Sequence, residues 1–166
     1  MSEAFVDTDA LIACQSIDRC LAEGSLQAAG RIFLRVAGSS MMPSLWPGDL
    51  LTLERRKISQ VSQGDMAVFF CNKMLVVHRV VLRRASYLIT QGDTALAPDA
   101  PVTEDRLLGV VASVLRNGKQ FTPARTPSLA SRAIAGLVRR SRLVNKALQR
   151  AYAMTTSGKA PLGAKS

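Results

Sequence analysis

The chain has 166 residues, of which 48% are hydrophobic, so it is long enough for one domain with a packed core and is not globally disordered. Its formal net charge of +10 is unevenly distributed: residues 1–105 contain all twelve Asp and Glu and ten Lys and Arg, whereas residues 106–166 contain twelve Lys and Arg and no acid. It has no basic N-terminal region and no apolar run of the roughly 20 residues that span a bilayer, so we expect neither a secretory signal nor a membrane anchor.

Residues 1–24 predict a short helical segment at the N-terminus. Asp9 is suited to cap the start of a helix and Gly24 to end it, with apolar residues such as Leu11 and Leu21 between them. Because β-rich stretches begin near residue 31, we expect this segment to be an appendage to the main domain.

Residues 25–121 predict the main domain, which is built from short β-rich stretches separated by turns. The expected strands cover residues 31–36, 49–53, 66–71, 74–82, 87–90 and 107–115. No helical pattern separates these strands. The domain is therefore predicted to be mainly β, an antiparallel barrel or sandwich.

The C-terminal part predicts a linker, a basic amphipathic helix and a tail. Residues 122–127 contain two prolines and read as a linker, and the predicted linker and helix together cover residues 122–154. Within 128–152 an apolar stripe and a basic face alternate with helical period. The stripe comprises Leu129, Ala133, Leu137, Val144, Leu148 and Tyr152, and the basic face Arg132, Arg139, Lys146 and Arg150. Residues 155–166 are rich in Gly, Ser, Ala and Lys and are expected to be disordered.

One serine, the only histidine and one aspartate lie within or just after expected strands: Ser40, His78 and Asp93. A serine hydroxyl is a poor nucleophile until a neighbouring base takes its proton, and histidine exchanges protons most readily near neutral pH. An aspartate on the far side of the imidazole orients the ring and stabilises its charged form. These residues predict a Ser-His-Asp catalytic triad, with Asp99 as a second candidate acid and with no cofactor or metal.

Each of these residues also has a purely structural interpretation. Ser40 and Asp93 stand in turn-like segments, where their side chains often cap local backbone groups. A lone histidine in a strand, such as His78, is often a core or surface residue, and Asp99 can be a solvated loop acid. The three residues taken together in this order favour the catalytic interpretation.

The sequence SMMPSL (residues 40–45), with Gly48-Asp49 behind it, resembles the serine box Ser-Met-x-Pro-Thr-Leu…Gly-Asp of the signal peptidase I superfamily, which also includes the self-cleaving SOS repressors. Bacterial members use a lysine base. The sequence HRV (residues 78–80) resembles instead the histidine-base type of archaea and the endoplasmic reticulum, and QGD (residues 91–93) resembles its Gly-Asp-Asn box. The resemblance covers roughly residues 32–114.

The resemblance implies a mixed β fold with a shallow groove that binds substrate as an added strand and prefers small side chains at the first and third positions before the cut. It implies Ser40 as nucleophile, His78 as base and then acid, and Asp93 as the orienting residue. The backbone N–H of Ser40 would line the oxyanion hole, with Ser39 in place of the family's serine at the position of Gly38. The leading prediction is a soluble serine endopeptidase that cleaves an extended peptide or leader through an acyl-enzyme.

Two other functions remain open. A self-cleaving regulator of the SOS-repressor kind would bind DNA, although residues 1–30 are short and acidic for a helix-turn-helix domain and a histidine replaces the lysine base. A non-catalytic module that binds a peptide or a membrane surface would keep the fold without a complete oxyanion hole.

The basic helix predicted over residues 128–152 has three interpretations. It packs its apolar stripe on the domain, lies on an anionic membrane surface, or binds nucleic acid or another protein. Opposed apolar and basic faces favour the membrane surface, and no known motif supports nucleic acid. Cys14, Cys20 and Cys71 are odd in number and lack metal-like spacing, which fits a reducing compartment. We expect a cytoplasmic protein, with peripheral attachment at the inner membrane surface as an additional possibility.

Overall fold

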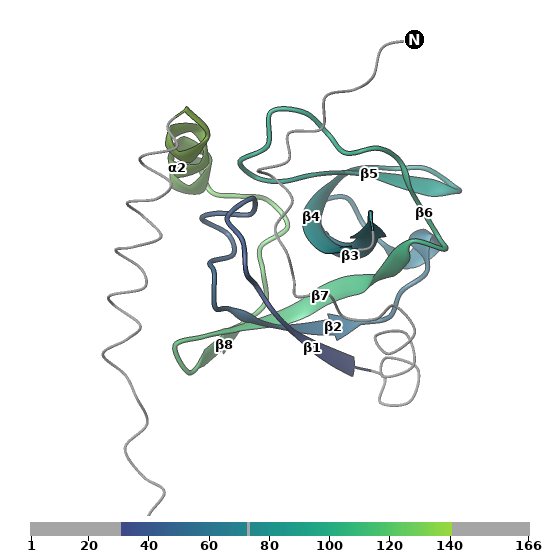
Figure 1. The fold of residues 1–166 in the computed structure, drawn as a ribbon, viewed down its shortest axis with the longest axis horizontal. Coiled ribbons are helices and arrows are strands. Elements are labelled where there is room, and N and C mark those ends of the chain that lie inside the picture. The colour runs from purple at the N-terminus through teal and green to yellow at the C-terminus, as the bar shows by residue number, and fades with distance from the viewer. Residues whose placement is uncertain (1–30, 73, 141–166) are drawn as a thin grey trace, which may run out of the picture.

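The computed structural model describes residues 31–72 and 74–140, which form one antiparallel sheet of eight strands and a C-terminal helix (Figure 1). The predicted helix in residues 1–24, the part of the predicted basic helix beyond residue 140 and the predicted tail 155–166 lie outside the described residues. The elements in chain order are β1 (Arg31–Arg35), β2 (Leu50–Glu54), the 3₁₀ turn η2 (Ile58–Gln60), β3 (Met66–Cys71), β4 (Met74–Arg83), β5 (Tyr87–Gln91), β6 (Val102–Thr103), β7 (Leu107–Arg116), β8 (Lys119–Phe121) and α2 (Leu129–Arg140).

The sheet runs in the order β1-β2-β7-β3-β4-β5-β6, and β8 pairs with β7. Among the described strands β1 and β6 have one neighbour each, so the sheet is open and not closed into a barrel. It curls strongly in Figure 1, and the pairing register shifts within β2–β7, β3–β7 and β4–β5. Such irregularities bend strands and increase their twist. The mainly β, antiparallel prediction is confirmed, and the expected strands are found with each end within one residue of its predicted position.

Both faces of β3 are buried because the sheet curls around it. Met66, Val68 and Phe70 point into one hydrophobic cluster, and Ala67 and Phe69 point into a second. The alternation follows from the two-residue period of a strand. Cores on both sides explain why this strand is apolar throughout instead of alternating with polar residues.

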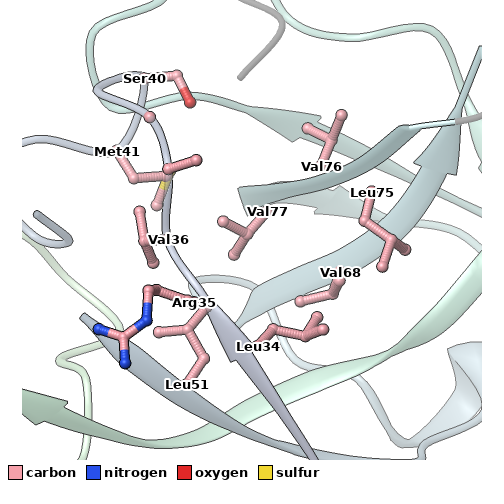
Figure 2. Close-up of a pocket in the computed structure, with 12 residues that line it drawn as sticks. Leu34, Arg35, Val36, Ser40, Met41, Leu51, Val68, Leu75, Val76 and Val77 are labelled. Atoms are coloured by element: carbon pink, nitrogen blue, oxygen red, sulfur yellow. The ribbon is translucent and has the colours of Figure 1, made fainter. Parts of the chain in front are cut away.

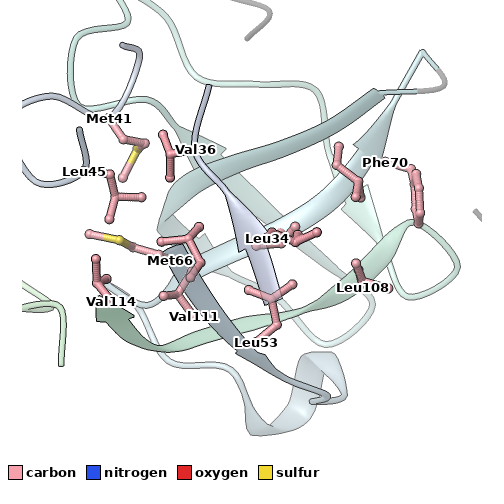
Figure 3. Close-up of a cluster of buried hydrophobic side chains, with 13 residues drawn as sticks. Leu34, Val36, Met41, Leu45, Leu53, Met66, Phe70, Leu108, Val111 and Val114 are labelled. Atoms are coloured by element: carbon pink, nitrogen blue, oxygen red, sulfur yellow. The ribbon is translucent and has the colours of Figure 1, made fainter. Parts of the chain in front are cut away.

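The loop between β1 and β2 is packed into the first hydrophobic cluster, which Figure 3 shows. Met41 and Leu45 of this loop are buried within it, and Met42 is also fully buried. Each such side chain contributes about 1.5–3 kcal/mol when it is removed from water. Burial of these side chains therefore fixes the conformation of the β1–β2 loop.

The helix α2 begins within the predicted basic segment, after a connection from β8 that has no regular secondary structure. Ser128 caps it, because the backbone N–H of Ser131 donates to Ser128 Oγ at 3.1 Å. Across residues 31–72 and 74–140, none of the helices has the length and apolar character needed to cross a membrane.

Candidate active site

Ser40 lies on the β1–β2 loop, in which Met41, Met42 and Leu45 are buried in the core. Ser40 is half-buried, whereas Met41 and Met42 after it are buried. The loop is closed by backbone bonds from Met42 N to Ser39 O (3.0 Å) and from Leu45 N to Met41 O (2.9 Å). The hydroxyl of Ser40 is thus held on a fixed turn.

His78 extends from β4 toward Ser40, with 3.0 Å between His78 Nε2 and Ser40 Oγ. The residue is buried, with 4% of its surface exposed. Its ring meets Phe69 edge-on with 6.2 Å between the ring centroids, and the small Ala67 pairs with it on β3. These neighbours leave the imidazole little room to turn away from the hydroxyl.

The other imidazole nitrogen, His78 Nδ1, lies 2.7 Å from Asp99 Oδ2. The same oxygen accepts a bond from the buried Thr90 Oγ1 at 2.6 Å, and Asp99 N donates to Thr90 O at 2.8 Å. An ionised carboxylate can only accept hydrogen bonds, so Nδ1 carries the proton toward it. The lone pair of Nε2 then faces Ser40, which is the arrangement a general base requires.

The prediction that Asp93 orients His78 is corrected by this geometry. Asp93 Oδ1 accepts from Arg79 Nε at 2.9 Å, and Asp93 Oδ2 accepts from Arg79 Nη2 at 2.9 Å and from Ser44 Oγ. Arg79 is 93% buried, so its charge needs a carboxylate partner. Asp93 serves that need, and Asp99, the second candidate acid, occupies the position beside the imidazole.

Two aspartate–arginine pairs meet at Ser44, four residues after Ser40: one is buried on both sides, and in the other the arginine is partly exposed. Ser44 Oγ joins the Asp93–Arg79 pair, and Ser44 O accepts from Arg116 Nη2 at 3.0 Å. Arg116 also binds both oxygens of Asp49, at 2.9 Å and 2.6 Å, and Asp49 is fully buried. These pairs hold the loop of Ser40 through polar contacts, in addition to its apolar contacts with the core. From the sequence, Asp49 is recognised only as part of the Gly48-Asp49 motif and not as the partner of an arginine.

Gly92 and Thr94 were not identified from the sequence as site residues, yet both touch the Ser40 turn. Thr94 N and Thr94 Oγ1 donate to Ser40 O at 2.9 Å and 3.1 Å. A Cβ on Gly92 would lie 3.0 Å from His78 Nε2 and 3.2 Å from Ser40 Cβ. Only a residue without a side chain fits there without displacing the hydroxyl and the imidazole.

An apolar pocket opens beside Ser40, between the end of β1 and strand β4 (Figure 2). Its lining includes Leu34, Val36, Gly38, Met41, Val76 and Val77. Ser40 lies at its edge in Figure 2. Ser39 is buried beside the nucleophile position, and the assignment of Ser39 and Ser40 N to an oxyanion hole stays a prediction. Within the described residues, no three His, Cys, Asp or Glu side chains group as metal ligands would.

Comparison with known proteins adds one family. Residues 12–113 match a protein-family model described as Peptidase S24-like. The match covers more than half of the chain and includes Ser40, His78, Asp93 and Asp99. It ends within β7, before β8 and α2. No curated protein matches the chain.

Proposed function

We propose that this chain, which belongs to the Peptidase S24-like family, is a serine endopeptidase. Its proposed catalytic triad is Ser40, His78 and Asp99. The observation that carries the proposal is the unbroken chain of contacts from Ser40 Oγ to His78 Nε2 (3.0 Å) and from His78 Nδ1 to Asp99 Oδ2 (2.7 Å). The acid differs from the one expected from the sequence, and the nucleophile and base are the same.

In the proposed reaction Ser40 Oγ attacks the carbonyl carbon of a peptide bond while His78 Nε2 takes the hydroxyl proton. The imidazolium formed is stabilised by Asp99 at Nδ1. His78 then gives the proton to the leaving amine, which leaves an acyl group on Ser40. Water, deprotonated by the same His78 Nε2, releases the acyl group and restores the serine. Backbone donors near Ser39 and Ser40 would stabilise the oxyanion, and one such donor is worth about 3 kcal/mol.

The substrate proposed is an extended peptide with small residues near the cut. The apolar pocket at Ser40 supports this, because it is lined by apolar side chains from β1, β2, β3 and β4 and leaves space beside the hydroxyl for a side chain. β1 pairs only with β2 among the described strands, and its end lines that pocket. An extended chain laid along such an edge gains backbone hydrogen bonds without sequence preference, and the pocket then selects the side chain.

Cleavage of a peptide library centred on Ala-x-Ala, read by mass spectrometry, tests this function. We expect wild type to cut after small residues, and Ser40→Ala and His78→Ala to be inactive. In parallel, a fluorophosphonate probe should label wild type at Ser40 and should not label Ser40→Ala. Wild type that neither cuts nor is labelled would contradict the peptidase proposal and favour a peptide-binding module of the same fold.

Gly92→Ala is expected to slow labelling and cleavage by about ten- to a hundredfold, because misplacing a catalytic group by about 1 Å can cost about a hundredfold in rate. Its new Cβ would press on His78 Nε2 and on the Ser40 turn. Gly136→Ala is the matched control, because a Cβ there meets nothing within 4 Å. Equal rates for both variants would show that Gly92 does not protect the Ser40–His78 geometry.

A further inference from the structure

Over residues 129–137, the helix α2 turns its large apolar side chains to solvent. Leu129 is 82% exposed, Leu137 61% and Ile134 37%. Leu129, Ala133 and Leu137 are spaced four residues apart, so they form one stripe along the helix. Among residues 129–137 of α2, the one that is buried is the small Ala135, which lies on a different side of the helix. The interpretation in which this stripe packs on the domain is therefore wrong for Leu129 and Leu137.

The charge beside this stripe has a single sign. Arg132 of α2 is exposed, and Arg139 and Arg140 follow in the sequence of the same helix. No Asp or Glu occurs anywhere after Asp105. Exposed leucines flanked by cations without acids match the two chemical layers of an anionic lipid surface, an apolar interior below negatively charged headgroups. We propose that α2 is a docking helix for an anionic membrane surface.

The connection between α2 and the domain is fixed by polar contacts. Arg79 Nη1 donates to the carbonyl oxygens of Ala124 (2.8 Å) and Arg125 (3.1 Å). Arg125 Nε is in turn 2.8 Å from Asp65 Oδ1. A Cβ on Gly64 would lie 2.6 Å from Arg125 O, so the backbones are in direct contact. The predicted linker is thus held against the domain.

These contacts join the docking helix to the candidate active site, because Arg79 follows His78 in β4. A membrane bound through α2 would hold the Ser40 pocket at a constant position relative to the lipid surface. This part rests on the proposed function: the peptide cut would then be a segment presented at a membrane surface, where a tethered enzyme meets it at a raised effective concentration.

Co-sedimentation of the full chain with vesicles tests the docking surface. Wild type should bind vesicles of phosphatidylcholine mixed with phosphatidylglycerol, bind pure phosphatidylcholine at least about tenfold more weakly, and lose affinity as salt is raised. Leu129→Ser/Leu137→Ser should weaken binding to the anionic vesicles by about tenfold or more, because it removes apolar area and leaves the charge unchanged. Leu96→Ser is the matched control, because Leu96 is also a leucine with 80% exposure but lies outside α2, and it should bind as wild type does.

Three results would overturn the proposal: no binding to anionic vesicles, equal binding to both vesicle types, or a double variant that binds as wild type does. Preference for duplex DNA over vesicles in a competition would also overturn it in favour of a nucleic-acid partner. Thermal unfolding of each variant checks the fold: because the substituted side chains are exposed, the unfolding temperature should stay close to that of wild type. Fluorophosphonate labelling of Ser40 in the same samples reports the proposed function separately, so docking without labelling would contradict only the peptidase proposal.

Discussion

Asp99→Asn is expected to lower the rates of peptide cleavage and of fluorophosphonate labelling by about 10³- to 10⁴-fold while the protein stays folded. In wild type the Asp99 carboxylate accepts from His78 Nδ1, which leaves Nε2 free to accept the proton of Ser40. The amide of asparagine can donate to Nδ1 instead. The imidazole then carries its proton on Nε2, facing the hydroxyl, and cannot act as a base.

Asp93→Asn provides the comparison that separates the two acids. It changes the same chemical group six positions away, but in contact with Arg79 and Ser44 instead of the imidazole. At a temperature where both variants are folded, we expect Asp93→Asn to retain far more activity per folded molecule than Asp99→Asn. The opposite ranking would return Asp93 to the orienting role predicted from the sequence.

Asp93→Ala is expected to lower the free energy of unfolding by about 3–5 kcal/mol, the range found when one partner of a buried ion pair is removed. The side chains of Arg79 and Asp93 are 8% and 7% exposed. The substitution would leave the guanidinium buried without its counter-charge. Urea unfolding followed by circular dichroism measures the change, with the slope against urea compared to confirm that the transition remains two-state.

Arg125→Ala is the control for that measurement. It removes an ion pair with Asp65 in which the arginine side chain is 61% exposed, and exposed pairs contribute about 0–1 kcal/mol. The backbone oxygen of Arg125, which Arg79 binds, is retained. Similar losses of unfolding free energy for Asp93→Ala and Arg125→Ala would mean that the buried Asp93–Arg79 pair contributes no more to stability than the exposed Arg125–Asp65 pair.

The strands could be predicted because apolar runs and turns are local properties of a chain. Residues 66–71 and 74–82 are predicted as strands, and they form the paired strands β3 and β4 with nearly those bounds. β6 and β8 were missed because they are two and three residues long, which is too short for a period to show. The open order of the sheet depends on which strands pair, and hydrophobic patterns do not specify this.

Ser40 and His78 could be singled out from the sequence because their local motifs are distinctive, and the structure brings their side chains together; their catalytic roles stay a prediction. The prediction that Asp93 lies beside the imidazole is wrong, because the choice between Asp93 and Asp99 depends on a third residue. Arg79 is buried and captures Asp93, and nothing in its immediate sequence shows that burial. Thr90, which binds Asp99, is an ordinary strand residue by sequence. Its contribution appears only when β5 and the following loop are placed together.

Two groups that stabilise the surroundings of Ser40 lie late in the chain: the side chain of Arg116 and the carbonyl oxygens that Arg79 binds. Ser44 O is bound by Arg116, which is 72 residues further along the chain, and Arg79 is bound to carbonyls of Ala124 and Arg125, more than 40 residues after it. A nascent chain on the ribosome therefore contains its serine and histidine well before the groups that hold them in register. The contacts that hold Ser40 and His78 in place can therefore all form only after residue 125 has left the exit tunnel.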